Sequence, residues 1–273
     1  VKLAVDQLDR PHLVYSVLNT PNNEDGLRYA LGSNTADDPS QFEIINIVSD
    51  ASLGTAVPIG SVPTRLGQRF CMTLDGNRVV AAFLDGAEKW LYIARGGLQG
   101  FRYERLQNEI AQTDLGLNDQ RYLDFSTHEI GEHCAISSRD GDVDLIFTNE
   151  RTWSLMSYHG PIGGPGLVQV VDSGLDEGRS VMGASPVLST DAQNRLVAVY
   201  QDATRNDLLL NIRGNGQWLS EPIVVESKGA VGYSNSLKIE NNNAFIGTVQ
   251  IITDTGGRER SRVLFYPIDL SGY

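Results

Sequence analysis

The chain has 273 residues, of which 22 are lysine or arginine and 34 are aspartate or glutamate, so its formal net charge is −12. A nucleic-acid-binding surface needs a basic stripe that displaces counterions, and no such stripe occurs in the sequence. The longest apolar runs, such as Val79–Phe83, are about five residues, against the ~20 residues of a membrane-spanning helix. Composition therefore argues against nucleic-acid binding and against membrane insertion. The length of the chain allows one large all-β domain or two ordinary ones.

Five segments share one pattern, in which an apolar run, a tight turn and a second apolar run follow one another. In chain order they are Leu3–Ser16, Cys71–Asp85, Cys134–Asn149, Leu188–Asp202 and Leu237–Ile251. The spacings between their landmarks are 68, 64, 53 and 49 residues, counted along Tyr15, Phe83, Phe147, Tyr200 and Val249. Such a loose repeat predicts one supersecondary unit copied along the chain.

Each unit is expected to hold antiparallel strands joined by short turns. Residues that tolerate positive φ mark the first turn, for example Asp75-Gly76-Asn77 and Asp140-Gly141-Asp142. A third β-rich run follows at Leu27–Leu31, Trp90–Arg95, Trp153–Tyr158, Leu208–Arg213 and Arg262–Tyr266. A fourth run follows in four units, at Phe42–Val48, Phe101–Leu106, Leu167–Val171 and Pro222–Val225. Only Glu104–Gln112 has a pattern that allows a helical turn.

Four antiparallel strands per unit of roughly 40–65 residues are typical of the blade of a β-propeller. The sequence thus predicts an all-β fold, a five-bladed β-propeller of four-stranded antiparallel blades. The blades are expected at about 1–50, 66–107, 132–172, 184–227 and 233–273. The fifth unit has three recognisable strands before Tyr273, so we expect an incomplete, three-stranded last blade. The alternative is an ordinary β-sandwich with chance alternation.

Two segments carry a more specific pattern. Asp6–Tyr15 has the form Asp-x-x-x-Arg-Pro-His-Leu-Val-Tyr, and Asp191–Tyr200 repeats it as Asp-Ala-Gln-Asn-Arg-Leu-Val-Ala-Val-Tyr. Together with Leu27-Arg28-Tyr29-Ala30 and Gly216-Gln217-Trp218, it resembles the degenerate sialidase-like (BNR-type) repeats of bacterial secreted β-propellers. The resemblance implies one domain over 1–273 that is secreted, periplasmic or on the cell surface. The Ser-x-Asp-x-Gly-x-x-Trp box of true sialidases is absent, so their activity is not implied.

The ligand site of such a fold is expected where the innermost strands begin, because several strand ends converge there. The connection Gln107–Gly131 leads into a polar stretch, taken as a loop, that contributes His128, Glu129, Glu132 and His133. Arg69, Arg179, Tyr233 and Asn235 are expected at the same entrance, where they can hold a carboxylate or a sugar hydroxyl. These eight residues are the ligand-binding candidates.

Metal and cofactor sites are not expected. The run His128-Glu129-x-x-Glu132-His133 lacks the second histidine of an HExxH motif, and Gly131 disfavours the helix that such a motif needs. His12 lies in the middle of a strand, where a core or cross-strand role is expected, and His159 is expected to be solvated. The default role of Trp90, Trp153 and Trp218, which recur at equivalent positions, is packing.

Cys71 and Cys134 take equivalent positions in neighbouring inner strands, so both are expected to be buried. Two free thiols are the default interpretation. A disulfide is the alternative, if the two Cα atoms lie within about 7 Å of each other.

Function is predicted less directly than architecture. The inner strands begin with Arg69-Phe70, Ala184-Ser185 and Ser234-Asn235, none of them acidic. The first hypothesis is therefore a non-catalytic module that binds a protein or a glycan through its loop-rich face. The alternative is a carbohydrate-active enzyme, a glycoside hydrolase or polysaccharide lyase, whose catalytic candidates are His128, Glu129, Glu132 and Tyr233. A third hypothesis is a structural domain of a larger surface protein.

Overall fold

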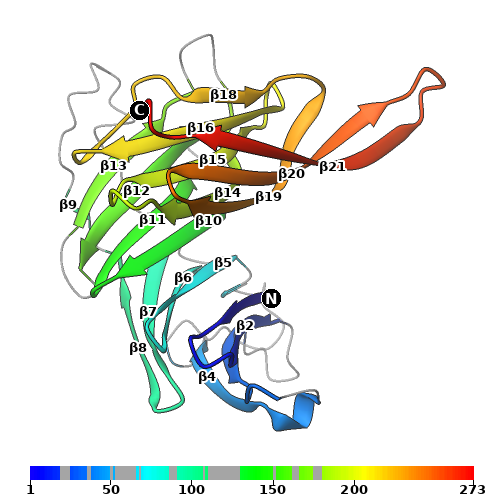
Figure 1. Ribbon diagram of the computed structural model, residues 1–273. Helices are drawn as coiled ribbons and strands as arrows, with labels where there is room; N and C mark the ends of the chain where they lie inside the picture. The colour runs from blue at the N-terminus through cyan, green and yellow to red at the C-terminus, as the bar shows by residue number, and fades with distance from the viewer. Residues whose placement is uncertain are drawn as a thin grey trace.

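The computed structural model describes residues 1–18, 25–35, 38–49, 52, 66–67, 69–85, 91–106, 108–109, 130–149, 152–161, 166–174 and 180–273. The fold is all-β, with five antiparallel sheets and one short 3₁₀ turn at Pro39–Gln41 (Figure 1). No helix in the described part of the chain is long and apolar enough to cross a membrane.

Each sheet is built mainly from consecutive strands. The first sheet contains β1 (Lys2–Val5), β2 (Pro11–Val17), β3 (Gly26–Leu31) and β4 (Glu43–Ser49). The second contains β5 (Phe70–Asp75), β6 (Arg78–Leu84), β7 (Leu91–Gly97) and β8 (Gly100–Arg105). The third contains β10 (Ile130–Arg139), β11 (Asp142–Asn149), β12 (Ser154–Pro161) and β13 (Gly166–Asp172), and the short β9 (Asn108–Glu109) pairs with β13 in parallel.

The last two sheets complete the described fold. The fourth contains β14 (Met182–Thr190), β15 (Leu196–Asp202) and β16 (Asp207–Gly214), with β17 (Gln217–Trp218) and β18 (Ile223–Glu226) both paired to β16. The fifth contains β19 (Ala230–Glu240), β20 (Asn243–Thr253) and β21 (Glu259–Asp269). The three strands of this last sheet confirm the prediction of an incomplete final unit.

The sheets follow one another around an axis, as in a propeller. The first strand of each sheet contacts the first strand of the next, in the order β1, β5, β10, β14 and β19. The first and fifth sheets are separate from each other, so the ring of sheets is open (Figure 1). A two-layer sandwich is therefore excluded.

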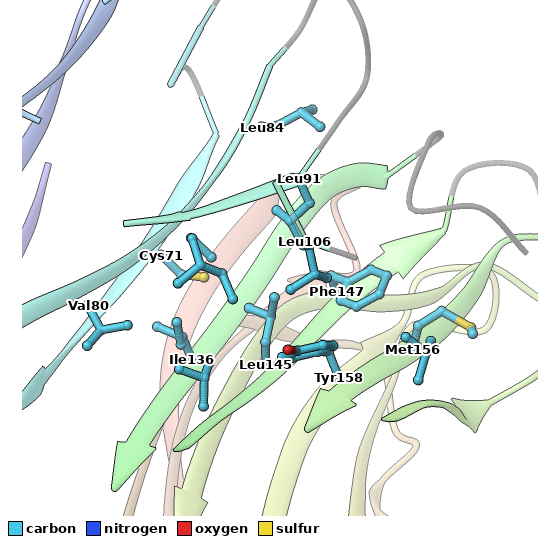
Figure 2. Close-up of a cluster of buried hydrophobic side chains, with 14 residues drawn as sticks. Cys71, Val80, Leu84, Leu91, Leu106, Ile136, Leu145, Phe147, Met156 and Tyr158 are labelled. Atoms are coloured by element: carbon cyan, nitrogen blue, oxygen red, sulfur yellow. The ribbon is translucent and has the colours of Figure 1, made fainter. Parts of the chain in front are cut away.

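Face-to-face packing of neighbouring sheets creates the core. Strand β6 is apolar from Val79 to Leu84 because both of its faces are buried. Its Val79, Ala81 and Phe83 side chains pack toward the first sheet, and the alternate side chains pack toward the third. Figure 2 shows the second of these clusters, where Val80 faces Ile136 and Leu145 of the third sheet.

The Asp-x-x-x-Arg pattern forms the same turn in two sheets. Asp6 Oδ1 accepts hydrogen bonds from the backbone N–H groups of Leu8 and Arg10, each at 2.9 Å, and Arg10 Nε donates to Oδ2 at 2.8 Å. Asp191 and Arg195 repeat this arrangement, with Nε to Oδ2 at 2.7 Å. Burial alone would raise the pKa of Asp6, but the hydrogen bonds from Arg10, His12 and Leu8 hold it well below its usual range.

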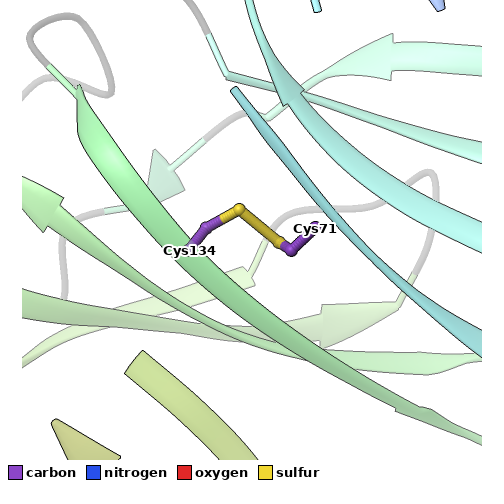
Figure 3. Close-up of a disulfide and its surroundings, with 2 residues drawn as sticks. All are labelled: Cys71 and Cys134. Atoms are coloured by element: carbon purple, nitrogen blue, oxygen red, sulfur yellow. A yellow bond between two sulfur atoms is a disulfide. The ribbon is translucent and has the colours of Figure 1, made fainter. Parts of the chain in front are cut away.

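Cys71 and Cys134 form a disulfide, so the default expectation of two free thiols is wrong. Their Cα atoms lie 5.8 Å apart, within the range that a disulfide spans. The bond joins β5 to β10, the innermost strands of the second and third sheets (Figure 3). It therefore ties two neighbouring sheets together at the axis.

Three further expectations are corrected. The described part of Glu104–Gln112 is strand rather than helix, because it continues β8 and contributes β9. Trp153 is 44% exposed in a turn with φ of 60°, so it is not a core residue, whereas Trp218 packs against the core and Trp90 lies outside the described residues. His159 lies on β12 and bonds to Asp144, so it is not simply solvated. The prediction for His12 is confirmed, because this buried ring shares a hydrogen bond with Tyr29 on β3.

Candidate functional site

The candidate site, called here the channel mouth, is the end of the axis at which the first halves of β1, β5, β10, β14 and β19 lie. Two observations show that these strand ends come together. The disulfide sets Cys71 of β5 beside Cys134 of β10, near the beginning of each strand. On the opposite flank, Asn235 Nδ2 donates to the backbone oxygen of Ser185 at 3.0 Å, joining β19 to β14. The mouth is thus assembled from parts of the chain that are far apart in sequence.

Three inner strands depart from regular pairing close to the mouth. The register shifts between Ile130 and Cys134 in β10, and within Ala184–Val187 and Tyr233–Ser236 in β14 and β19. Ser185 and Ser234 have positive φ values of 47° and 50°, which are uncommon for serine. Bulges of this kind change the direction of side chains and are frequent beside functional sites.

Two cations act on His133 near the mouth. His133 is largely buried, and burial lowers its pKa, with the positive charges of Arg69 and Lys2 lowering it further. The imidazole is consequently neutral at neutral pH and lies in the field of two cations. Because Lys2, Arg69 and His133 come from three different sheets, the effect arises only in the folded chain.

Polar groups from the fourth and fifth sheets supply the other side of the mouth. Tyr233 is half-buried, and its hydroxyl donates to Asn206 Oδ1 at 3.1 Å. Asn235 uses both ends of its amide within the protein, because Thr248 Oγ1 donates to its Oδ1 at 2.7 Å. The geometry therefore favours a structural role for Asn235, while Ser185 Oγ accepts a hydrogen bond from the Ser234 N–H at 3.4 Å.

The structure describes some of the candidate residues predicted from the sequence but not all of them. Arg69 lies directly before β5, whereas His133 is the fourth residue of β10 and Tyr233 and Asn235 are the fourth and sixth residues of β19. Glu132 and His133 belong to strand β10, so the interpretation of this stretch as a loop is wrong at these two positions. His128, Glu129 and Arg179 lie outside the described residues.

Sequence reasoning missed Lys2, Ser185 and Ser234 as mouth residues. The signal for the serines was present, because Ala184-Ser185 and Ser234-Asn235 begin equivalent strands. Lys2 was not recognised because a lysine within the strand pattern of β1 forms no motif that marks a site. None of the described side chains at these strand beginnings is acidic, so the described mouth does not supply the pair of carboxylates that hydrolysis of a glycosidic bond uses.

No protein-family model matches the chain, and no curated protein matches it. Solved structures do resemble it. The polysaccharide lyase Uly1 has a TM-score of 0.53 at 10% sequence identity, over 98% of this chain and 57% of that protein. An exo-beta-1,3-galactanase from Clostridium thermocellum has a TM-score of 0.49 at 11% identity, over 97% of this chain and 57% of that protein.

A subtype N10 neuraminidase-like protein of A/little yellow-shouldered bat/Guatemala has a TM-score of 0.48 at 10% identity, over 98% of this chain and 80% of that protein. The chain thus spans little more than half the length of the first two structures. At these identities the likeness concerns the fold alone. Together with the serial packing of the sheets, it assigns the chain to the β-propeller class.

Proposed function

We propose that the chain is a carbohydrate-recognising propeller, with each of its five sheets acting as a blade, that binds an acidic glycan at the channel mouth. The observation that carries the proposal is that the charges of Lys2 and Arg69 both act on the half-buried His133. In a chain with net charge −12, this positive field is local. A local field of one sign raises the local concentration of a ligand of the opposite sign.

The groups available at the mouth suit a sugar that bears a carboxylate. A guanidinium such as that of Arg69 can hold a carboxylate through two parallel hydrogen bonds. Tyr233, Ser185 and Ser234 offer hydroxyl groups, which can both donate to and accept from sugar hydroxyls. Because these groups lie on bulges tied by the Asn235 bond, they are held in place before a ligand arrives.

A second candidate function is supported by His133 in particular. A neutral imidazole can act as a general base, and a neighbouring cation can stabilise the negative charge that develops when a proton leaves the carbon next to a carboxylate. In such an elimination, the base takes that proton, a carbon–carbon double bond forms, and the glycosidic oxygen leaves with the electron pair and is protonated. The chain would then be a polysaccharide lyase. A hydrolase would instead depend on Glu129 and Glu132.

The disulfide supports an oxidising environment for the protein. Structural disulfides persist in secreted, periplasmic and cell-surface proteins and are rare in the cytosol. We therefore place the chain in one of these compartments, as a single propeller domain that can belong to a larger surface protein.

Binding of oligosaccharides to the whole chain tests the proposal. Uronic acid oligosaccharides and neutral oligosaccharides of equal length are compared by isothermal titration calorimetry. We expect saturable binding of the acidic set only, weakened at least tenfold in Arg69→Gln and unchanged in the control Arg28→Gln, which alters an exposed arginine on β3. Equal binding of both sets, or equal effects of the two substitutions, would contradict it.

The lyase hypothesis has its own measurement. Elimination creates an unsaturated sugar, whose double bond absorbs ultraviolet light. Turnover by the wild-type chain that is lost in His133→Gln, with binding retained, would support catalysis. Binding without any change in absorbance would leave the chain as a non-catalytic module and exclude the lyase.

A further inference from the structure

An exposed tryptophan lies on the face of the propeller that contains the channel mouth. Strand β10 begins on this face at Ile130, which pairs with Asn149 at the end of β11, and Asn149 also pairs with Ser154 at the beginning of β12. Trp153 is the last residue of the turn between β11 and β12, so this turn opens on the same face. Because its side chain is 44% exposed, a large aromatic group is presented to solvent there.

The backbone of Trp153 is held in an unfavourable conformation. Its φ of 60° lies in the left-handed region, which a bulky side chain rarely adopts. Its N–H donates to the backbone oxygen of Asn149 at 2.8 Å, and its own backbone oxygen accepts from the N–H of Met182 in β14 at 2.8 Å. A glycine would adopt this conformation without strain, so the turn itself does not require a tryptophan. Backbone strain of this kind is concentrated at ligand sites.

Hydrogen bonds connect this turn to the mouth through the fourth sheet. Val181 directly precedes β14, and its backbone oxygen accepts from the N–H of Ala203 at 2.8 Å, in the turn between β15 and β16. The same turn contains Asn206, whose Oδ1 accepts from the hydroxyl of Tyr233 at 3.1 Å. Trp153 and Tyr233 therefore lie at the two ends of one row of connected turns. A ligand that extends along this row from Tyr233 reaches the indole.

The size and charge of the surroundings favour a small, uncharged ring. Trp153 and the 38% exposed Val181 together present far less surface than the roughly 800 Å² per partner of a stable protein interface. The turn between β15 and β16 contains two carboxylates, Asp202 and Asp207, and one cation, Arg205, so its charge does not attract a further carboxylate. An indole has an apolar face, which suits the C–H face of a neutral sugar.

We propose that Trp153 stacks on a neutral sugar residue of a glycan whose acidic residue lies at the channel mouth. The inference rests on the function proposed above and adds to it that the ligand is a mixed glycan, with neutral as well as acidic sugars. Stacking removes the apolar face of the sugar ring from water. The two backbone hydrogen bonds of Trp153 hold the indole in place before the ligand arrives, which limits the entropy lost on binding.

Calorimetry on the whole chain tests this with three probes: a uronic acid monosaccharide, a mixed oligosaccharide of one uronic acid and several neutral sugars, and a uronic acid oligosaccharide of the same length. We expect the mixed oligosaccharide to bind at least tenfold more tightly than either of the others. Trp153→Ala should remove this gain and leave the affinity for the other two probes unchanged. Trp153→Phe, which keeps an aromatic face, should retain most of the gain.

Trp153→Gly separates a binding role from a structural one. Glycine adopts the positive φ of this position without strain, so the variant should keep the unfolding midpoint of the wild-type chain. It should nevertheless lose the same affinity for the mixed oligosaccharide as Trp153→Ala. A lowered midpoint with unchanged affinity would show that the side chain is structural and would overturn the proposal.

The controls distinguish this inference from the function on which it rests. Phe265→Ala removes an exposed aromatic side chain from the fifth sheet and should leave all three affinities unchanged. Arg69→Gln should weaken all three probes, because each carries a carboxylate. If no probe binds, or if Arg69→Gln has no effect, the proposed function fails and this inference fails with it. If Arg69→Gln acts as expected but Trp153→Ala and Trp153→Gly keep full affinity for the mixed oligosaccharide, this inference alone is overturned.

Discussion

The second, third and fourth sheets are covered on both faces, whereas the first and fifth sheets are covered on one face only. Strand β15 of the fourth sheet is buried at every position from Leu196 to Asp202. In the fifth sheet burial alternates, and Val263 and Phe265 on its open face are 79% and 66% exposed. The comparison shows that sheets of this chain are stabilised chiefly by their neighbours, as in other repeat architectures.

The terminal sheets compensate for the missing neighbour in different ways. The first sheet contains a buried polar chain, in which His12 Nε2 lies 3.2 Å from Asp6 Oδ2 and Nδ1 lies 2.9 Å from the Tyr29 hydroxyl. The fifth sheet relies on long strands, since β20 and β21 pair from Asn243–Asp269 to Thr253–Glu259 without a register shift. Internal bonding thus replaces part of the packing that the central sheets receive.

The largest expected difference is between two phenylalanines. Phe83 is fully buried in the second sheet and stacks on Tyr92 at 5.5 Å, so Phe83→Ala should lower the free energy of unfolding by about 3–5 kcal/mol. Phe265→Ala on the open face of the fifth sheet should cost less than about 1 kcal/mol. Chemical denaturation measures both, and similar losses would contradict the distinction between central and terminal sheets.

The disulfide is expected to have the next largest effect. It closes a loop between residues 63 apart, so the double variant Cys71→Ser, Cys134→Ser should lose about 2–4 kcal/mol of unfolding free energy. A reductant should lower the unfolding free energy of the wild-type chain by a similar amount and leave that of the double variant unchanged. If the reductant shifts both chains equally, the bond is not what stabilises this pair of sheets.

Tyr29→Phe tests the compensation within the first sheet. Burial raises the pKa of Tyr29 to about 12, so its hydroxyl stays protonated and bonded to His12. Removing it leaves a buried imidazole nitrogen without this partner, at a cost of about 1–3 kcal/mol. The matched control is Tyr103→Phe, whose hydroxyl bonds to Ser52 at an exposed position and should matter much less. Equal losses of unfolding free energy in the two variants would contradict a special role for the buried hydrogen bonds that join Asp6, His12 and Tyr29.

The smallest expected effect is a pH dependence where the third sheet meets the fourth. The hydrogen bond that His159 Nδ1 donates to Asp144 Oδ1 raises the pKa of His159, against the effects of burial and of Arg213. Its contribution to stability is therefore complete below the unfolded pKa of about 6.5 and is lost as pH rises through the raised folded value. Because the ring is partly exposed, solvent screening limits the contribution to about 0.5 kcal/mol. His159→Gln should remove this dependence, which pH-dependent denaturation measures.

Sequence patterns predicted much of the fold, since its signals are local. Alternation and turn residues such as Gly76 and Asn194 set the hairpins, and both have the positive φ that these turns require. The disulfide stayed undecided because the distance between two sheets is not encoded in any one segment. The same limit applies to the pairing of Arg95 on β7 with Arg102 on β8, since it depends on the exact register of one hairpin.

The site was predicted less completely than the fold for a physical reason. A bulge inserts one residue and redirects the side chains around it, and nothing in the composition of Ala184-Ser185 or Ser234-Asn235 shows that shift. The lowered pKa of His133 likewise arises from burial and from the charges of Arg69 and Lys2, which belong to other parts of the chain. Such properties exist only after the sheets have packed.

Titration of His133 by nuclear magnetic resonance tests the central claim most directly. In the free chain its pKa should lie below the ordinary value, with the resonance assigned from its absence in His133→Gln. Saturation with a uronic acid oligosaccharide should raise that pKa, because a carboxylate at the mouth offsets the charges of Arg69 and Lys2. An unchanged pKa at saturation would show that the acidic ligand binds elsewhere.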